Sequence, residues 1–174
     1  MQQIIEKISE EKGVPFSMEE SPMFNGKMNV PIKVYKLNYP SKTGHIHLIG
    51  EYRRNTWQKP SMLKHIHNTD IYLWEIKLIV DSKLPKFKIE KNSWLKTAFL
   101  HQHVLSIKCK DERLYRSLYY SEKLADLLAG NNGKLSGTII SDGHTMYTNF
   151  NTMLNHEQLI TRALETFETI ENII

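Results

Sequence analysis

The sequence predicts a single domain of the α+β class, in which an N-terminal helix and two C-terminal helices pack on one face of a mostly antiparallel sheet. Two observations support this prediction: segments of alternating apolar residues fill much of the first two thirds, and the last third runs in the order strand, helix, hairpin, helix. The chain of 174 residues is long enough for one domain (1–174) with its own core, and its hydrophobic content of 40% is ordinary for a globular protein.

The first third of the chain predicts one helix and two strands. Residues 2–12 carry a short apolar stripe at helical spacing, and Gly13 ends it. Residues 17–29 contain several helix and strand breakers, so we expect a connector there. Alternating apolar residues predict strands at 30–38 and 44–52.

The middle of the chain predicts a long loop followed by three strands. Residues 53–69 are polar and basic, which favours a loop. The segment 70–80 is apolar on both of its faces, so we expect a strand in the centre of the sheet. Further strands are predicted at 85–90 and 100–109.

The last third has the clearest pattern. We expect one amphipathic helix over 111–129, then a hairpin of 135–140 and 145–150 that turns at Asp142-Gly143. A final helix begins after Asn155, a residue type that caps helix N-termini. Its expected buried positions are Leu159, Ala163, Phe167 and Ile170.

Four segments carry a loose resemblance to an uncharacterised bacterial domain family with membrane-anchored members. They are Gly50-Glu-Tyr-Arg53, Val104-Leu-Ser-Ile-Lys-Cys109, the helix 114–128 and Ile140-Ser-Asp-Gly-His144. The function of that family is unassigned, so the resemblance implies a similar fold and no catalytic residue. This chain departs from the family because it has no apolar run of the roughly 18–20 residues that a membrane span needs.

Charge is distributed unevenly along the chain. The net charge is +4, yet residues 53–116 carry fourteen basic and six acidic side chains, whereas residues 117–174 carry three and seven. The basic middle favours an anionic partner. The single cysteine, Cys109, and an N-terminus without the features of a signal peptide lead us to expect a cytoplasmic location.

Six of the eight histidines form the His-x-His pairs His45/His47, His65/His67 and His101/His103. Histidines two apart on a strand point to the same face and could bind one metal ion. His45, His47 and Glu51 together resemble the first metal motif of cupin barrels, but the framing glycines are missing and no second motif follows. We therefore expect no cofactor, and a metal-dependent enzyme with a divalent transition metal remains the alternative.

The basic segment 53–96 offers a second alternative. Arginine and lysine alternate there with Trp57 and Trp94, and single-stranded nucleic acid is bound by cations interleaved with aromatic rings. Lysines on a solvated strand face give the same pattern, so nucleic acid is possible as a partner but is not favoured.

The sequence contains no motif framed for catalysis, which favours a non-enzymatic module that binds another protein. Accessory, adaptor and toxin-neutralising immunity roles all fit. The expected docking residues are Arg53, Arg54, Trp57 and Lys59, because arginine and tryptophan are enriched at interface hot spots and the cations suit an acidic partner surface. We expect Trp57 to be exposed in the free protein and buried on binding.

Overall fold

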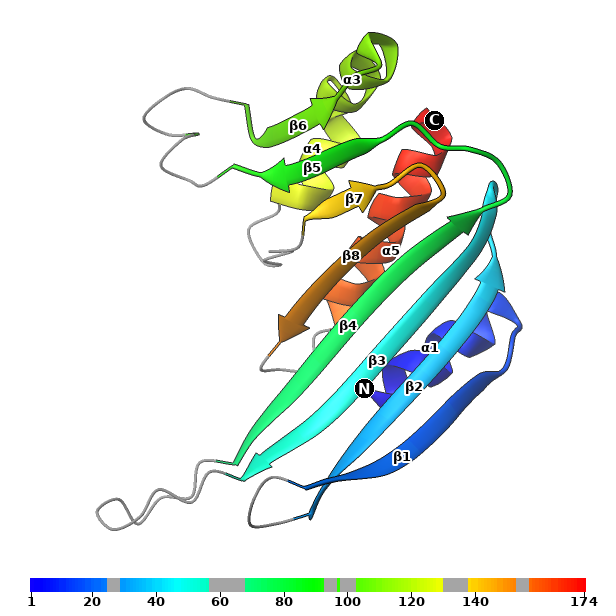
Figure 1. Cartoon of the computed structure of the whole chain (residues 1–174), viewed down its shortest axis with the longest axis vertical. Coiled ribbons are helices and arrows are strands. Elements are labelled where there is room, and N and C mark those ends of the chain that lie inside the picture. The colour runs from blue at the N-terminus through cyan, green and yellow to red at the C-terminus, as the bar shows by residue number, and fades with distance from the viewer. Residues whose placement is uncertain (25–28, 57–67, 93–96, 98–102, 130–137, 153–156) are drawn as a thin grey trace.

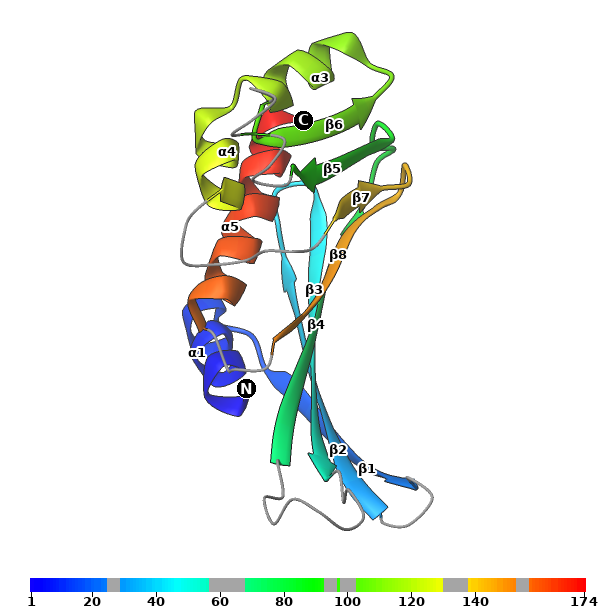
Figure 2. The same ribbon diagram turned by 90° about the vertical axis from the view of Figure 1, so that its left-hand side faces the viewer.

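The computed structural model describes the chain except for residues 25–28, 57–67, 93–96, 98–102, 130–137 and 153–156. The described residues form one eight-stranded sheet with helices on one of its faces (Figures 1 and 2). All the strand pairings are antiparallel, in the spatial order β1-β2-β3-β4-β8-β7-β5-β6. The predicted α+β class, with the helices on one face, is confirmed.

The elements have the following bounds. The helices are α1 (Gln2–Lys12), α3 (Glu112–Tyr119), α4 (Glu122–Ala129) and α5 (Glu157–Ile173). The strands are β1 (Phe16–Phe24), β2 (Asn29–Pro40), β3 (Gly44–Thr56), β4 (Asn68–Val80), β5 (Phe87–Lys91), β6 (Leu105–Cys109), β7 (Ile139–Ser141) and β8 (Thr145–Thr152).

The predicted connector over 17–29 is wrong for most of its length. Residues 16–24 form β1, the edge strand that pairs with β2. Pro22 is tolerated because an edge strand needs hydrogen bonds on one side only. The Phe16 ring lies 6.5 Å from that of Tyr35, so contacts with β2 outweigh the weak strand propensity of the segment.

The predicted loop over 53–69 is shorter than expected. β3 continues as a regular strand to Thr56, and β4 begins at Asn68, with Thr56 and Asn68 directly paired. The predicted central place of 70–80 is confirmed, since β4 lies between β3 and β8. The long β3–β4 ladder is visible along the middle of the sheet in Figure 1.

The single helix predicted over 111–129 is two helices, α3 and α4. Asp111 caps α3 by accepting a hydrogen bond from the Leu114 N–H at 3.0 Å. Ser121 provides a second cap, because its Oγ accepts from the Leu124 N–H at 3.2 Å. The second cap starts a new helix at Glu122 and lets the chain turn at Tyr120.

The predicted turn at Asp142-Gly143 and the final helix are confirmed, whereas residues 135–137 of the predicted hairpin and the predicted cap Asn155 lie outside the described residues. The Asp142 carboxylate accepts hydrogen bonds from the N–H groups of His144 and Thr145, and these bonds lower its pKa. Gly143 adopts a φ of 107°, a conformation that glycine permits. The four predicted apolar positions of α5 are all buried.

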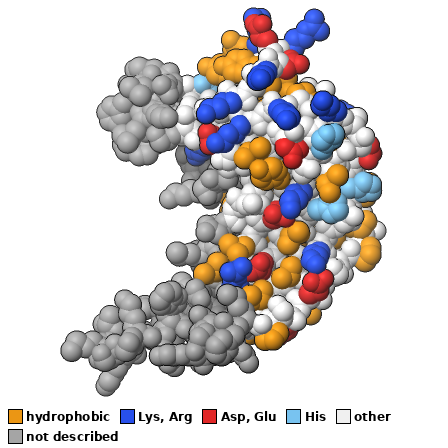
Figure 3. Space-filling model, in the orientation of Figure 1, with side chains coloured by type: hydrophobic (Ala, Val, Ile, Leu, Met, Phe, Trp, Pro, Cys, Tyr) orange, Lys and Arg blue, Asp and Glu red, His pale blue; other side chains and the backbone are white. Residues whose placement is uncertain are grey.

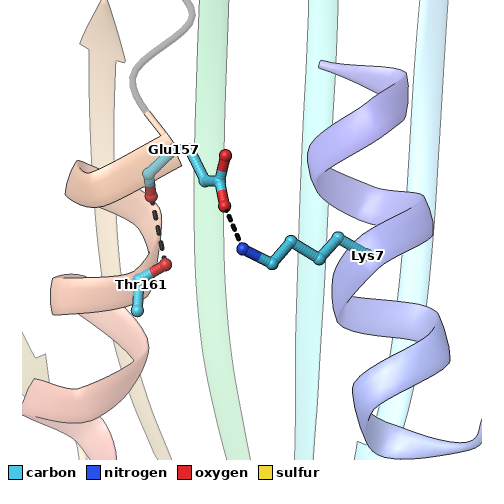
Figure 4. A network of polar contacts seen from close by, with 3 residues as sticks. All are labelled: Lys7, Glu157 and Thr161. Atoms are coloured by element: carbon cyan, nitrogen blue, oxygen red, sulfur yellow. Dashed lines mark hydrogen bonds and ion pairs between the residues drawn. The ribbon is translucent and has the colours of Figure 1, made fainter.

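The core lies between the sheet and the helical layer. Trp74, Ile76 and Leu78 of β4 are almost wholly buried, as is Phe167 of α5. Helices α1 and α5 are also linked by exposed ion pairs, Lys7–Glu157 at 2.5 Å (Figure 4) and Lys12–Glu168 at 3.0 Å. Such exposed pairs add little stability, so burial of the apolar faces holds the layers together.

Candidate functional site: the open face of the sheet

The helices lie on one face of the sheet, and no described element covers the opposite face, which we call the open face (Figures 2 and 3). Strand alternation and register place on it every second residue of the long central strands. From β3 these are His45, His47, Ile49, Glu51 and Arg53. From β4 they are Ile71, Leu73, Glu75, Lys77 and Ile79.

Five aliphatic side chains form a U-shaped band on the open face, around Glu51 and Arg53. The aliphatic band consists of Ile32 and Val34 from β2, Ile49 from β3, and Ile71 and Leu73 from β4. All five are half-buried, unlike the fully buried residues on the other face of the same strands. An antiparallel sheet with one solvated face normally carries polar residues there, so this band is more apolar than solvation requires.

Ion pairs border the aliphatic band. Glu51 accepts a hydrogen bond from the Arg53 guanidinium, and the Lys77 ammonium lies 2.7 Å from Glu75. In the amide orientation that satisfies both groups, the Asn149 nitrogen donates to Glu75 at 3.3 Å. By register, Arg53 lies between Ile32 and Ile71, and Glu51 lies between Val34 and Leu73, so the aliphatic side chains surround the Glu51–Arg53 ion pair on three sides.

The open face is hollowed at this place. A hollow of about 590 Å³ is lined on the open face by Ile49, Glu51, Leu73, Glu75 and Asn149. Two carboxylates and two aliphatic side chains thus face the same space. The hollow is wide open, which suits a protruding group of a partner better than an enclosed small molecule.

The predicted docking residues do not form one group in the described part of the chain. Arg53 and Arg54 belong to strand β3 and not to a loop, because β3 extends to Thr56. Arg53 lies on the open face and pairs with Glu51. Trp57 and Lys59 lie outside the described residues, so the predicted exposure of Trp57 stays a prediction.

The predicted metal residues share a face but not a site. β3 keeps a regular pairing across Gly50, so His45, His47 and Glu51 all lie on the open face. Glu51 is four residues beyond His47, about 13 Å along the strand, whereas ligands of one ion lie about 2 Å from it. Within the described ranges, no group of three or more His, Cys, Asp or Glu side chains is placed to hold a metal.

The environment of His47 also disfavours positive charge. Partial burial, followed by the nearby His45 and Lys77, lowers the pKa of His47 from its ordinary value. Lys77 is the residue directly opposite His47 on β4. Because a cation beside the imidazole repels a metal ion as well as a proton, this position favours a neutral histidine in the sheet surface.

The third histidine pair is described only at His103, which has a structural role. Its ring stacks on Tyr119 with the ring centroids 4.1 Å apart, and its Nδ1 accepts from the Leu105 N–H at 3.2 Å. These contacts join the start of β6 to α3. His101 and the pair His65/His67 lie outside the described residues.

Sequence reasoning did not select the aliphatic band. Its signal is present in the segment 70–80, where apolar residues occupy both faces and only one face can meet the helices. The pairing of β3 with β2 and with β4 then places Ile49 diagonally next to both Val34 and Leu73. That adjacency depends on register, which single strands do not reveal.

Comparison with protein-family models, with curated proteins and with solved structures gives no match for this chain. No helix in the described residues has the length and apolar character of a membrane span. The function must therefore be inferred from the side chains and their geometry.

Proposed function

We propose that this protein is a non-catalytic module that binds another protein on the open face of its sheet. The observation that carries the proposal is the aliphatic band, which is half-buried although the core is complete without it. Exposed apolar residues next to paired charges are typical of protein interaction sites. The occupant is a partner with an apolar protrusion that enters the hollow between Ile49 and Leu73, flanked by groups that meet the bordering ion pairs.

The proposal keeps the cytoplasmic location predicted from the sequence and leaves open whether the role is accessory, adaptor or immunity. It places the docking surface beside the predicted residue Arg53, not around Trp57. The Glu51 carboxylate is paired with Arg53 and the Glu75 carboxylate with Lys77. These ion pairs support a role in binding in preference to acid–base chemistry.

Affinity capture with patch variants tests the proposal. The protein is immobilised, exposed to a lysate of the source organism, and the captured partner is then purified and titrated. We expect Leu73→Glu to weaken binding of the purified partner at least about 100-fold, because a carboxylate would be buried in an apolar contact. Ile174→Glu is the matched control, since Ile174 is an exposed aliphatic residue at the end of α5.

Three outcomes would count against the proposal. Equal binding by the wild type and Leu73→Glu would place the partner elsewhere. Sedimentation showing a dimer that Leu73→Glu dissociates would make a second copy of this chain the occupant. Oligonucleotide binding that is lost in Leu73→Glu would favour the nucleic-acid alternative.

A further inference from the structure

A second depression lies at the end of the open face, where β5, β6 and the connector after β4 meet. It is a groove of about 800 Å³. Five lysines line the groove: Lys83, Lys86, Lys88, Lys108 and Lys110. Asp111 is the one acidic residue among its described lining, and that carboxylate caps α3. The concentration of positive charge around one depression sets this place apart from the paired charges of the aliphatic band.

Lys83 and Lys110 form no ion pair with an acidic residue in the described part of the chain. The pKa of Glu90 is lowered chiefly by its hydrogen bond with Lys88 and also by Lys108, and the pKa of Asp142 is lowered chiefly by backbone hydrogen bonds and also by Lys86. Lys88 pairs with Glu90 at 2.7 Å, whereas the other four show no ion pair with a described residue. Register also places Lys88 directly opposite Lys108, an arrangement of like charges that costs stability. Five lysines thus share the carboxylates of Glu90, Asp142 and Asp111, and the remaining surplus of positive charge favours a ligand of opposite sign.

The groove also offers an apolar contact. Leu84 and Phe87 are only 4% and 3% exposed, and Phe87 and Cys109 alternate with Lys88 and Lys108, so the side chains of Phe87 and Cys109 point to the helical side of the sheet. The half-buried Pro85 is the apolar residue of the described lining that is accessible beside the lysines. The site thus combines cations at the rim with an apolar contact. It suits a ligand that carries both carboxylates and an apolar side chain.

Nucleic acid fits this groove less well. Single strands are held by exposed aromatic rings on which bases stack, and Phe87, the one aromatic residue in the described lining, is buried. A duplex needs cations along an extended track, but the open face beyond the groove carries Glu75 and Glu51, each paired with a cation. The charge is confined to one end of the sheet.

We infer that this lysine groove binds an acidic peptide segment of the partner, with an apolar side chain of that segment against Pro85. The inference rests on the proposed function and deepens it. The register runs without a break from Leu73 and Lys77 on β4 through β8 and β7 to Lys88. The groove is therefore about 20 Å from the aliphatic band on one continuous surface, which one partner can span.

Fluorescence anisotropy tests the groove with a defined probe, a labelled peptide of six glutamates around a central Leu-Phe pair. We expect it to bind the wild type more weakly as salt rises. Lys86→Glu/Lys110→Glu should weaken binding at least about tenfold, because two cations at the rim are reversed. A peptide with serines in place of Leu-Phe should bind about three- to tenfold more weakly, since it lacks the apolar contact with Pro85.

The control variant Lys42→Glu/Lys123→Glu has the same net charge and should bind the peptide within about twofold of the wild type, because neither lysine lines the groove. If Lys86→Glu/Lys110→Glu fails to fold, Lys83→Gln/Lys108→Gln replaces it, with the same loss expected. Equal peptide binding by wild type and groove variant would overturn the inference. Failure of the wild type to bind the peptide at 1 mM in low salt would also overturn it. A third contrary result is that a ten-nucleotide oligothymidylate binds the wild type more tightly than the peptide does and that the groove variant loses this binding.

These outcomes are separable from failure of the proposed function. Leu73→Glu leaves the groove intact and should bind the acidic peptide like the wild type. If the groove inference is wrong, Lys86→Glu/Lys110→Glu binds the purified partner normally, while Leu73→Glu still loses it.

Discussion

At the scale of single residues, charged side chains of the open face are engaged with one another. Glu51 and Glu75 are each held by a cation, and His47 lies opposite Lys77. None of these groups is placed beside a nucleophile in the described residues. These contacts are consistent with a binding surface, and His47 is a pH-sensitive group on it.

The first prediction concerns the pH dependence of His47. Its pKa in the folded protein is lowered, chiefly by partial burial, so the unfolded chain takes up the proton more readily. The stability that neutral His47 contributes is fully present above the ordinary histidine pKa of about 6.5. It is lost as the pH falls through the lower pKa that His47 has in the folded protein. We expect His47→Gln to lose less stability than the wild type between pH 7 and pH 5 in urea unfolding. An equal loss in both proteins would contradict this assignment.

The second prediction concerns Phe167, which is fully buried in α5 against the core. Phe167→Ala should lower the free energy of unfolding by about 3–5 kcal/mol, because an aromatic core position is emptied. Urea unfolding followed by circular dichroism measures the change. A loss below about 1 kcal/mol would mean that α5 does not pack on the sheet as described.

At the scale of elements, sequence periodicity identified α1, most of the strands, the β7–β8 hairpin and α5. Periodicity failed where contacts with residues distant in the chain, or local helix caps, determine the secondary structure. β1 is a strand because β2 offers a hydrogen-bonding edge and Tyr35 contacts Phe16. The helix of 111–129 is divided because Ser121 caps a second helix, although the apolar spacing continues through the break.

The third prediction tests that division of the helix. Ser121→Ala removes the cap of α4 and should cost about 1 kcal/mol of stability, as the loss of an N-cap usually does. Ser121→Asp restores an acceptor at the same position and should retain most of the stability. If Ser121→Ala has no effect in thermal unfolding, the break after Tyr119 has another cause.

Site prediction failed for a related reason. Lys83, Lys86 and Lys88 are distant in the chain from Lys108 and Lys110, and the pairing of β5 with β6 brings the two groups together. Likewise, Ile49 and Leu73 become neighbours through register alone. The sequence shows that the middle of the chain is basic, but only the folded sheet shows that this charge surrounds one groove.

At the scale of the whole molecule, a twisted antiparallel sheet has its helices on one side (Figure 2), and its open face carries apolar and charged side chains (Figure 3). The aliphatic band lies on β2, β3 and β4, and the lysine groove lies at the far end of the same face. Under the proposed function, the helical side provides stability and the open side provides recognition. Substitutions on the two sides should therefore have different effects.

The fourth prediction concerns metal. Protein purified without a polyhistidine tag should contain no stoichiometric transition metal, because His45 and His47 lack a third ligand nearby and Lys77 opposes a cation. Elemental analysis by mass spectrometry measures the content. About one zinc or iron per chain that disappears in His45→Ala/His47→Ala would restore the metal-dependent enzyme as the leading function.

The most direct test of the central claim is methyl NMR of isoleucine-labelled protein during titration with the purified partner. If the partner docks on the open face, the methyl signals of Ile49 and Ile71 should shift or broaden. Those of Ile5 and Ile160, buried on the helical side, should stay in place. Shifts at Ile5 and Ile160 with unchanged signals at Ile49 and Ile71 would show that the partner binds the helical side, and would contradict the account.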